Sequence, residues 1–179
     1  MDDQETLIFD TGPLLHFARE GWLGPLKAVV GSRVAIIPDV VVAELQLAAL
    51  RDARVVPVLA QSWLKPRRLQ TDEEIHAFAT FAALLVRGER NRGEAGVLAL
   101  ASCTGGRAVI DDLVARKAAS RSGLRLSGTL ALLCEAIQDG LLTVPLVSAL
   151  ADDLLNGEYR LPFGSGGFEK WASENGMLP

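Results

Sequence analysis

The sequence predicts an α/β fold in which helices pack on a mainly parallel sheet. Short apolar runs alternate with helical segments along the chain, which is the pattern of β-α-β units. The strand-like runs are continuously apolar, as in strands that are covered on both faces. Apolar residues make up 49% of the 179 residues and aromatic residues only 6%, so the core is aliphatic. A chain of this length can bury one sizeable core.

In the first half of the chain, apolar runs predict three strands and turn residues place the helices between them. Pro13 lies in the first turn of a predicted helix, where proline is tolerated. Asp39 is the predicted N-cap of another helix. A run that contains Pro66 fits an edge strand, because proline cannot donate to a sheet ladder. The predicted strands are 6–9, 33–37 and 62–66, and the predicted helices are 14–19, 22–30 and 39–50.

The second half of the chain has clearer helix boundaries. Thr71 and Glu74 form a capping box in front of an apolar helix. Gly105, Gly123 and Gly140 each follow a helical segment, as C-terminal glycines do. The predicted strands are 107–110 and 124–126, and the predicted helices are 75–86, 94–102, 113–122, 130–139, 146–155 and a short one at 169–173. We expect one domain over 1–160 and a partly flexible, Gly-rich extension over 161–179.

Charge and cysteine content point to a protein of a reducing compartment. The net charge of −4 argues mildly against a general nucleic-acid binder, although a local basic patch is compatible with it. Cys103 and Cys134 have no CxxC spacing, so we expect reduced thiols in the core. Residues 1–6 are acidic and polar, unlike a signal peptide. No apolar run reaches the roughly 20 residues of a membrane span, so a cytoplasmic location is expected.

Acidic residues follow two of the predicted strands. Asp10 comes directly after the first strand, and Asp111 and Asp112 come after the strand at 107–110. Ligands bind beyond the carboxyl ends of parallel strands. If these two strands are parallel neighbours, their carboxylates meet at one edge of the sheet. The sequence leaves open whether Asp111 or Asp112 faces the site, and we prefer Asp112.

Two further acids lie on helices that begin near this edge. Glu44 has only apolar neighbours three and four residues away, and an acid on an apolar stripe needs a partner. Glu94 lies in the first turn of its helix. Each acid also has a purely structural interpretation. Asp10 and Asp112 could begin helices, Glu94 could complete a capping box with Asn91, and Glu44 could pair with an arginine.

Taken together, these carboxylates form a chemically coherent metal site. Several carboxylates in one pocket repel each other, and a divalent cation relieves the repulsion. Ligands that are all oxygen suit Mg²⁺ or Mn²⁺ better than Zn²⁺. Such ions activate water and neutralise the charge of a phosphodiester under attack. The predicted chemistry is therefore phosphodiester hydrolysis.

Four segments of the chain resemble PIN domains, and together they cover roughly residues 6–160. The opening segment LIFDTGPL looks like the first strand and acid of a PIN domain, and IPDVVVAEL looks like its second motif. The segment RGEAGVLALA is similar to that of a PIN-like subfamily, which VIDD with Ala115, Arg116 and Gly128-Thr129-Leu130 also resembles. Many PIN domains have Asp where this chain has Glu94.

The resemblance implies a three-layer α/β/α sandwich and a metal-dependent ribonuclease, as in VapC-type toxins of toxin–antitoxin pairs. The metal would be held by Asp10, Glu94 and one or both of Asp111 and Asp112, and Glu44 would belong to the catalytic set. Two hydroxyl groups would support these ligands, namely those of Thr11 and Thr129. The implied partners are RNA, a small antitoxin protein and a second copy of the chain, and no membrane.

Basic residues gather in three places, where they fit either solvated surface or a rim that grips RNA phosphates. The candidates for RNA binding are Arg92, Arg116 and Lys117, and Arg116 lies one helical turn from Asp112. Two other functions stay open at this point. One is a PIN fold with weak catalysis that acts through a protein partner. The other is an unrelated α/β protein with a nucleotide or phosphate ligand, in which Glu44 and Glu94 would not converge on Asp10.

Overall fold

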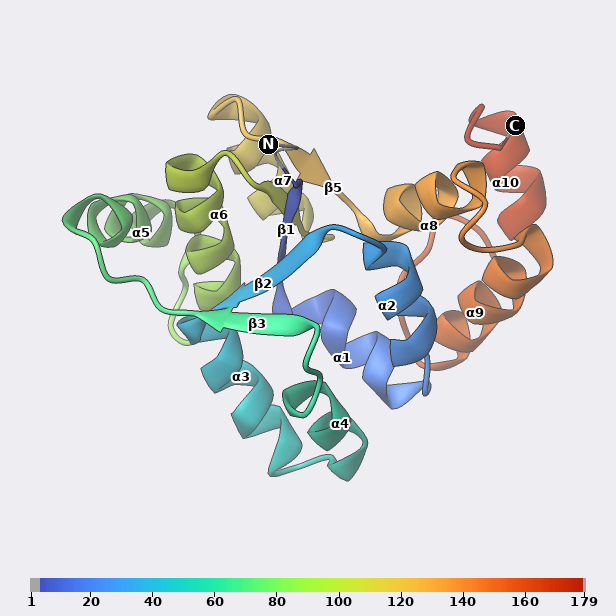
Figure 1. Ribbon diagram of the computed structural model, residues 1–179, viewed down its shortest axis with the longest axis horizontal. Coiled ribbons are helices and arrows are strands. Elements are labelled where there is room, and N and C mark those ends of the chain that lie inside the picture. The colour runs from blue at the N-terminus through green and yellow to red at the C-terminus, as the bar shows by residue number, and fades with distance from the viewer. Residues whose placement is uncertain (1–3, 179) are drawn as a thin grey trace.

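The computed structural model describes residues 4–178 and shows a five-stranded parallel sheet between two layers of helices (Figure 1). Residues 1–3, the beginning of the predicted polar N-terminus, and residue 179 lie outside the described part. The strand order is β3-β2-β1-β4-β5, and every pairing is parallel. The strands are β1 (Thr6–Phe9), β2 (Val34–Pro38), β3 (Leu64–Arg67), β4 (Arg107–Val109) and β5 (Leu126–Ser127). The predicted α/β/α sandwich is confirmed.

The helices divide between the two faces of the sheet. On one face α6 packs against β1, β2 and β4, and α5 packs on α6. On the other face α1, α2 and α8 enclose the side chains of β1 and β4, and α9 and α10 lie beyond them at the right of Figure 1. The helices are α1 (Thr11–Arg19), α2 (Leu23–Val30), α3 (Asp39–Ala49), the 3₁₀ helix η1 (Ala53–Val55), α4 (Val56–Leu59), α5 (Asp72–Leu85), α6 (Arg92–Thr104), α7 (Leu113–Arg121), α8 (Thr129–Gln138), α9 (Val144–Asn156) and α10 (Phe168–Glu174).

The helix boundaries show which sequence signals were correct. The capping box of Thr71 and Glu74 is present at the start of α5. Gly105 follows α6 with a φ of 70°, a left-handed conformation that glycine adopts without strain. The predicted N-cap at Asp39 is wrong by one position, because Pro38 holds the extended N-cap conformation. Asp39 is the first helical residue, and its carboxylate accepts a hydrogen bond from the Val40 amide.

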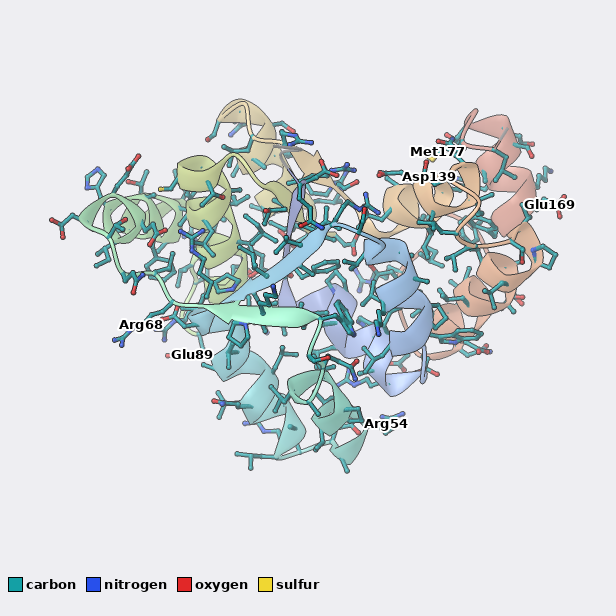
Figure 2. All side chains as sticks on the ribbon, viewed as in Figure 1. Arg54, Arg68, Glu89, Asp139, Glu169 and Met177 are labelled. Atoms are coloured by element: carbon teal, nitrogen blue, oxygen red, sulfur yellow. The ribbon has the colours of Figure 1, made fainter. Side chains whose placement is uncertain are left out.

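Burial follows the predicted aliphatic pattern. Leu7, Ile8 and Phe9 of β1 have no exposed surface, since the strand lies in the middle of the sheet and is covered on both faces. Figure 2 shows side chains filling the space between the sheet and both helical layers. Cys103 and Cys134 are free and lie on α6 and α8. Between residues 4 and 178, no helix is both long and apolar enough to cross a membrane.

A network of ion pairs holds the amino-terminal ends of the strands. Arg107 of β4 bonds to Glu5 at 2.5 Å and to Glu135 of α8 at 2.7 Å. Arg33 bonds to Glu135 at 2.5 Å, and Arg125 bonds to Glu5. The network joins the starts of β1, β2, β4 and β5 to one another and to α8. The acidic residues lie at the opposite edge of the sheet, where the strands end.

Candidate metal and RNA site

Asp10 is the centre of the candidate site. Because β1 lies between β2 and β4, the residue after it emerges in the middle of the carboxyl edge of the sheet. Its side chain is only 5% exposed. Oδ2 accepts a long 3.4 Å hydrogen bond from the Gly12 amide, so Asp10 also caps α1. Oδ1 is buried and has no hydrogen-bond partner among residues 4–178, which is costly for a carboxylate unless a ligand occupies the place.

Glu44 of α3 faces the same point. The hydroxyl of Thr11 donates a hydrogen bond to Glu44 Oε2, and the amide of Gly93 donates to Oε1 at 2.9 Å. Within the described residues Glu44 therefore pairs with Thr11 and Gly93, and the interpretation with an arginine partner is wrong. The two bonds join α1, α3 and α6 at one place and fix the orientation of the carboxylate.

Gly93 allows α6 to approach this closely. A Cβ at that position would lie 2.6 Å from Glu44 Oε2, 2.9 Å from Asp10 Oδ1 and 3.1 Å from Thr11 Oγ1. Distances below 3.0 Å are not tolerated by real Cβ atoms, so any larger residue would displace the carboxylates. This steric requirement was not predicted from the sequence, where Gly93 is simply one residue of the RGEAGVLALA segment.

Glu94 follows on the first turn of α6 and is half-buried. The capping-box interpretation of this residue is wrong. Asn91 adopts a left-handed conformation with a φ of 66°, and its side chain donates to the Leu85 carbonyl instead of capping α6. Burial raises the pKa of Glu94, and the negative charges of Glu44 and Asp112 raise it further. Glu94 therefore lies in the electrostatic field of both acids.

Asp112 and Asp111 have different surroundings. Asp112 is the N-cap of α7, as its structural interpretation required, and Oδ1 accepts from the amides of Val114 and Ala115 at 2.9 and 2.8 Å. This capping leaves Oδ2 without a hydrogen bond in the described chain. The charge of Asp112 is among the causes that raise the pKa of Glu94.

Both carboxylate oxygens of Asp111 already accept hydrogen bonds. The amide of Thr129 donates to Oδ1 at 2.8 Å, and its hydroxyl donates to Oδ2 at 2.5 Å. The hydroxyl of Tyr159 donates to Oδ2 as well, and the ring of His16 packs edge-on against the Tyr159 ring. The structure thus ties Thr129 to Asp111, and Thr11 to Glu44. Tyr159 was missed because a single tyrosine far along the chain gives no sequence signal.

Burial, followed by like-charge repulsion, sets the electrostatics of the site. Burial raises the pKa of Asp10 well above its ordinary range, and the charges of Glu94 and Glu44 add to the effect. No group of three or more His, Cys, Asp or Glu side chains within residues 4–178 has the spacing of a ready-made metal cage. Mg²⁺ nevertheless binds through one or two carboxylates together with water and substrate phosphate. An unpaired buried oxygen among all-oxygen donors fits such an ion.

The basic candidates lie around the acids in different ways. Arg92 is exposed, pairs with Glu89 at 3.4 Å and lines a cleft of about 480 Å³ that also contains Glu44. Figure 2 shows Glu89 on the side of the molecule toward which β3 points. Arg116 is half-buried and donates to the Ile110 carbonyl at 3.0 Å, whereas Lys117 is exposed. A separate hollow of about 500 Å³, between α3, α4 and β3, is lined by no acid among the described residues.

With this geometry known, comparison with other proteins identifies the family. The profile of a PIN-domain family, DUF3368, matches residues 6–163. This chain belongs to the PIN-domain family. The match includes Asp10, Glu44, Glu94, Asp111 and Asp112, and it extends past Tyr159. The unrelated α/β alternative is thereby excluded, in agreement with the convergence of Glu44 and Glu94 on Asp10.

Solved structures show the same fold. A chain of the VapBC2 complex from Rickettsia felis, crystallised with a DNA fragment from its promoter, aligns with a TM-score of 0.50. The sequences are 12% identical, and the alignment covers 69% of this chain and 98% of the other. At this identity the likeness concerns the PIN fold alone. No curated protein matches the sequence.

Proposed function

We propose that this PIN-domain protein is a metal-dependent endoribonuclease that hydrolyses RNA phosphodiester bonds. The observation that carries the proposal is the buried, unpartnered Oδ1 of Asp10 in the field of Glu44 and Glu94. A buried carboxylate oxygen without a hydrogen bond, near other negative charges, destabilises the folded protein. Such unfavourable arrangements are concentrated at functional sites. PIN domains are in general nucleases, which agrees with the proposal.

One or two of the acids Asp10, Glu94 and Asp112, together with water and substrate phosphate, would hold Mg²⁺ or Mn²⁺. Asp111 would support the site through its bonds to Thr129 and Tyr159. The bound ion would neutralise phosphate charge and lower the pKa of a water molecule. Glu44, held in place by Thr11 and Gly93, would lie beside the reacting centre.

A carboxylate of the site that does not bind the ion would take a proton from the attacking water. The oxygen of the water would bond to phosphorus while the bond from phosphorus to the leaving oxygen breaks. The proton taken by the carboxylate would pass to the leaving oxygen, so that atoms and charges balance. Glu94 would serve as a ligand of the ion. The longer side chain of Glu94, compared with Asp, is compatible with this role.

We further propose that the protein is the toxin of a toxin–antitoxin pair and acts in the cytoplasm. The family and the fold likeness to a VapBC2 chain support this proposal. An antitoxin or a second copy of the chain requires an apolar surface. Leu47 of α3 lines the Glu44 cleft and is 59% exposed, and Leu50, directly after α3, is 83% exposed. Expression of the wild-type chain in bacteria should arrest growth, whereas the Asp10→Asn variant should not.

The enzymatic proposal is tested by incubating the pure protein with single-stranded RNA and with total tRNA in Mg²⁺, Mn²⁺ or EDTA. We expect cleavage that requires the metal and is absent in Asp10→Asn. A protein that binds Mn²⁺ through Asp10 but cuts no RNA would favour the alternative of a PIN-fold regulatory module. A protein that neither cuts RNA nor binds metal would refute the proposal.

A further inference from the structure

A second pocket lies beside the acidic site and has a different character. Its volume is about 350 Å³, at the small end of the range for ligand pockets, which is about 300 to 1,000 Å³. Asp111 and Arg116 line one side of it, and residues of the C-terminal segment, among them Tyr159, Arg160 and Trp171, line the other. Asp111 therefore borders this pocket, and the negative charge of the adjacent residue, Asp112, raises the pKa of Glu94 in the acidic site.

The polar groups of the pocket favour an anionic ligand with hydrogen-bond acceptors. Asp111 is the only acid among the described residues that line the pocket, and both of its oxygens already accept bonds from Thr129 and Tyr159. Arg116 has five donors, of which Nη1 is bonded to the Ile110 carbonyl. Arg160 is exposed. The described lining thus contains two positive guanidinium groups and one carboxylate, and that carboxylate already accepts hydrogen bonds at both oxygens.

The walls of the pocket favour a flat apolar group. Leu130, Leu161, Pro162 and Met177 contribute apolar surface, and Trp171 adds an aromatic ring. Unpaired RNA bases bind in such places by stacking on aromatic side chains and by donating and accepting hydrogen bonds at their edges. A nucleotide combines a flat base with a phosphate, and the pocket combines apolar walls with two arginines.

We infer that this pocket receives the base of a nucleotide next to the bond that is cut. The inference rests on the proposed nuclease function and adds to it a base-binding subsite. Asp111 lines the pocket and Asp112 is the next residue in the chain, so a nucleotide that flanks a phosphate bound at the acids would lie next to the pocket. Arg116 and Arg160 then meet the base edge and the flanking phosphate.

The far wall of the pocket is fixed to the rest of the domain. The side chain of Gln138 on α8 donates to the Met177 carbonyl at 2.9 Å, and the Gly166 amide donates to Asp152 of α9 at 2.7 Å. Phe168 is buried, and the Trp171 ring lies 5.4 Å from that of Phe163. Figure 2 places Met177 close above α8. The pocket is therefore formed before RNA arrives, which reduces the entropy cost of binding.

The test measures RNA binding in the Asp10→Asn background, so that cleavage does not interfere. A short fluorescent single-stranded RNA is titrated, and each nucleotide is replaced in turn by an abasic one. We expect one position to lose affinity by roughly tenfold, the scale of one stacked base. Ala131→Phe, which fills the pocket from α8, should lower affinity for the intact RNA by a similar factor. In that variant the abasic substitution should cause no further loss.

Matched controls separate a filled pocket from general damage. Ala149→Phe places the same side chain on the exposed face of α9 and should leave affinity unchanged. Arg160→Gln should weaken binding and reduce its salt dependence, whereas Lys27→Gln, an exposed charge on α2, should not. A flat abasic scan, or an abasic loss that persists in Ala131→Phe, overturns the pocket assignment and leaves the nuclease proposal intact. Failure of every variant to bind RNA overturns both.

Discussion

Asp10→Asn should make the metal-free protein more stable while it abolishes function. The buried carboxylate of Asp10 is repelled by Glu94 and Glu44, and its Oδ1 has no partner in the described chain. Asparagine is nearly the same size, carries no charge and caps a helix as well as aspartate does, so α1 keeps its N-cap. Stabilising single substitutions contribute about 0.5–2 kcal/mol, and we expect a gain in this range.

The assay is thermal unfolding in EDTA. For a chain of this size, each kcal/mol shifts Tm by about 2–4 °C, so the variant should melt several degrees higher. The pKa of Asp10 is raised in the folded protein, so its ionisation opposes folding once the pH exceeds the ordinary aspartate pKa. The loss of stability grows with pH and reaches its full size above the raised pKa. The advantage of Asp10→Asn should therefore be present at neutral pH and disappear in acid.

Metal should reverse the order of stability. An ion at 100 times its Kd stabilises the folded state by about 2.7 kcal/mol, which would raise the Tm of the wild-type protein by roughly 5–10 °C. The variant should respond much less. If Asp10→Asn melts below the wild type in EDTA at neutral pH, the carboxylate of Asp10 is satisfied by contacts that are already present, and it does not need an ion.

Three further substitutions test other parts of the account. Gly93→Ala should reduce RNA cleavage by about 100-fold, because displacing catalytic groups by about 1 Å has that effect. Gly12→Ala is the control and should retain activity, because its Cβ would lie 3.6 Å from its nearest neighbour. Tyr159→Phe removes a hydroxyl bonded to Asp111 and should lower the free energy of unfolding by about 1–2 kcal/mol in urea titrations. The bonds of Glu135 to Arg107 and Arg33 lower its pKa despite the opposing effect of burial. Glu135→Gln should therefore lower Tm at neutral pH, and the loss should shrink as the pH falls below the ordinary glutamate pKa and through the lowered one.

The positions of the main acids could be predicted because they follow from local rules. Asp10 and Asp111 directly follow apolar strands, and the parallel β1–β4 pair brings both to one edge of the sheet. Glu44 was conspicuous as a charge on an apolar helical stripe. In each case the signal lies within a few residues of the acid itself, so that periodicity and strand ends were sufficient.

The remaining features depend on contacts between distant parts of the chain. Tyr159 bonds to Asp111 across 48 positions of sequence, and nothing near either residue indicates the pair. The role of Gly93 depends on how closely α6 approaches Glu44, which is a property of helix packing. Asn91 fitted a capping box by type and spacing, but its left-handed backbone directs the side chain to Leu85 instead. The predicted division at residue 160 stays a prediction.

The most direct test of the central claim is to locate the ion. Crystals of the wild-type protein soaked in Mn²⁺ should show an anomalous peak about 2.0–2.2 Å from Asp10 Oδ1, near Glu94 and Asp112, and crystals of Asp10→Asn should lack it. A peak at this place would establish the acids as the metal site on which the nuclease proposal depends. No peak there in the wild-type crystal, or an equal peak in the variant, would contradict the account.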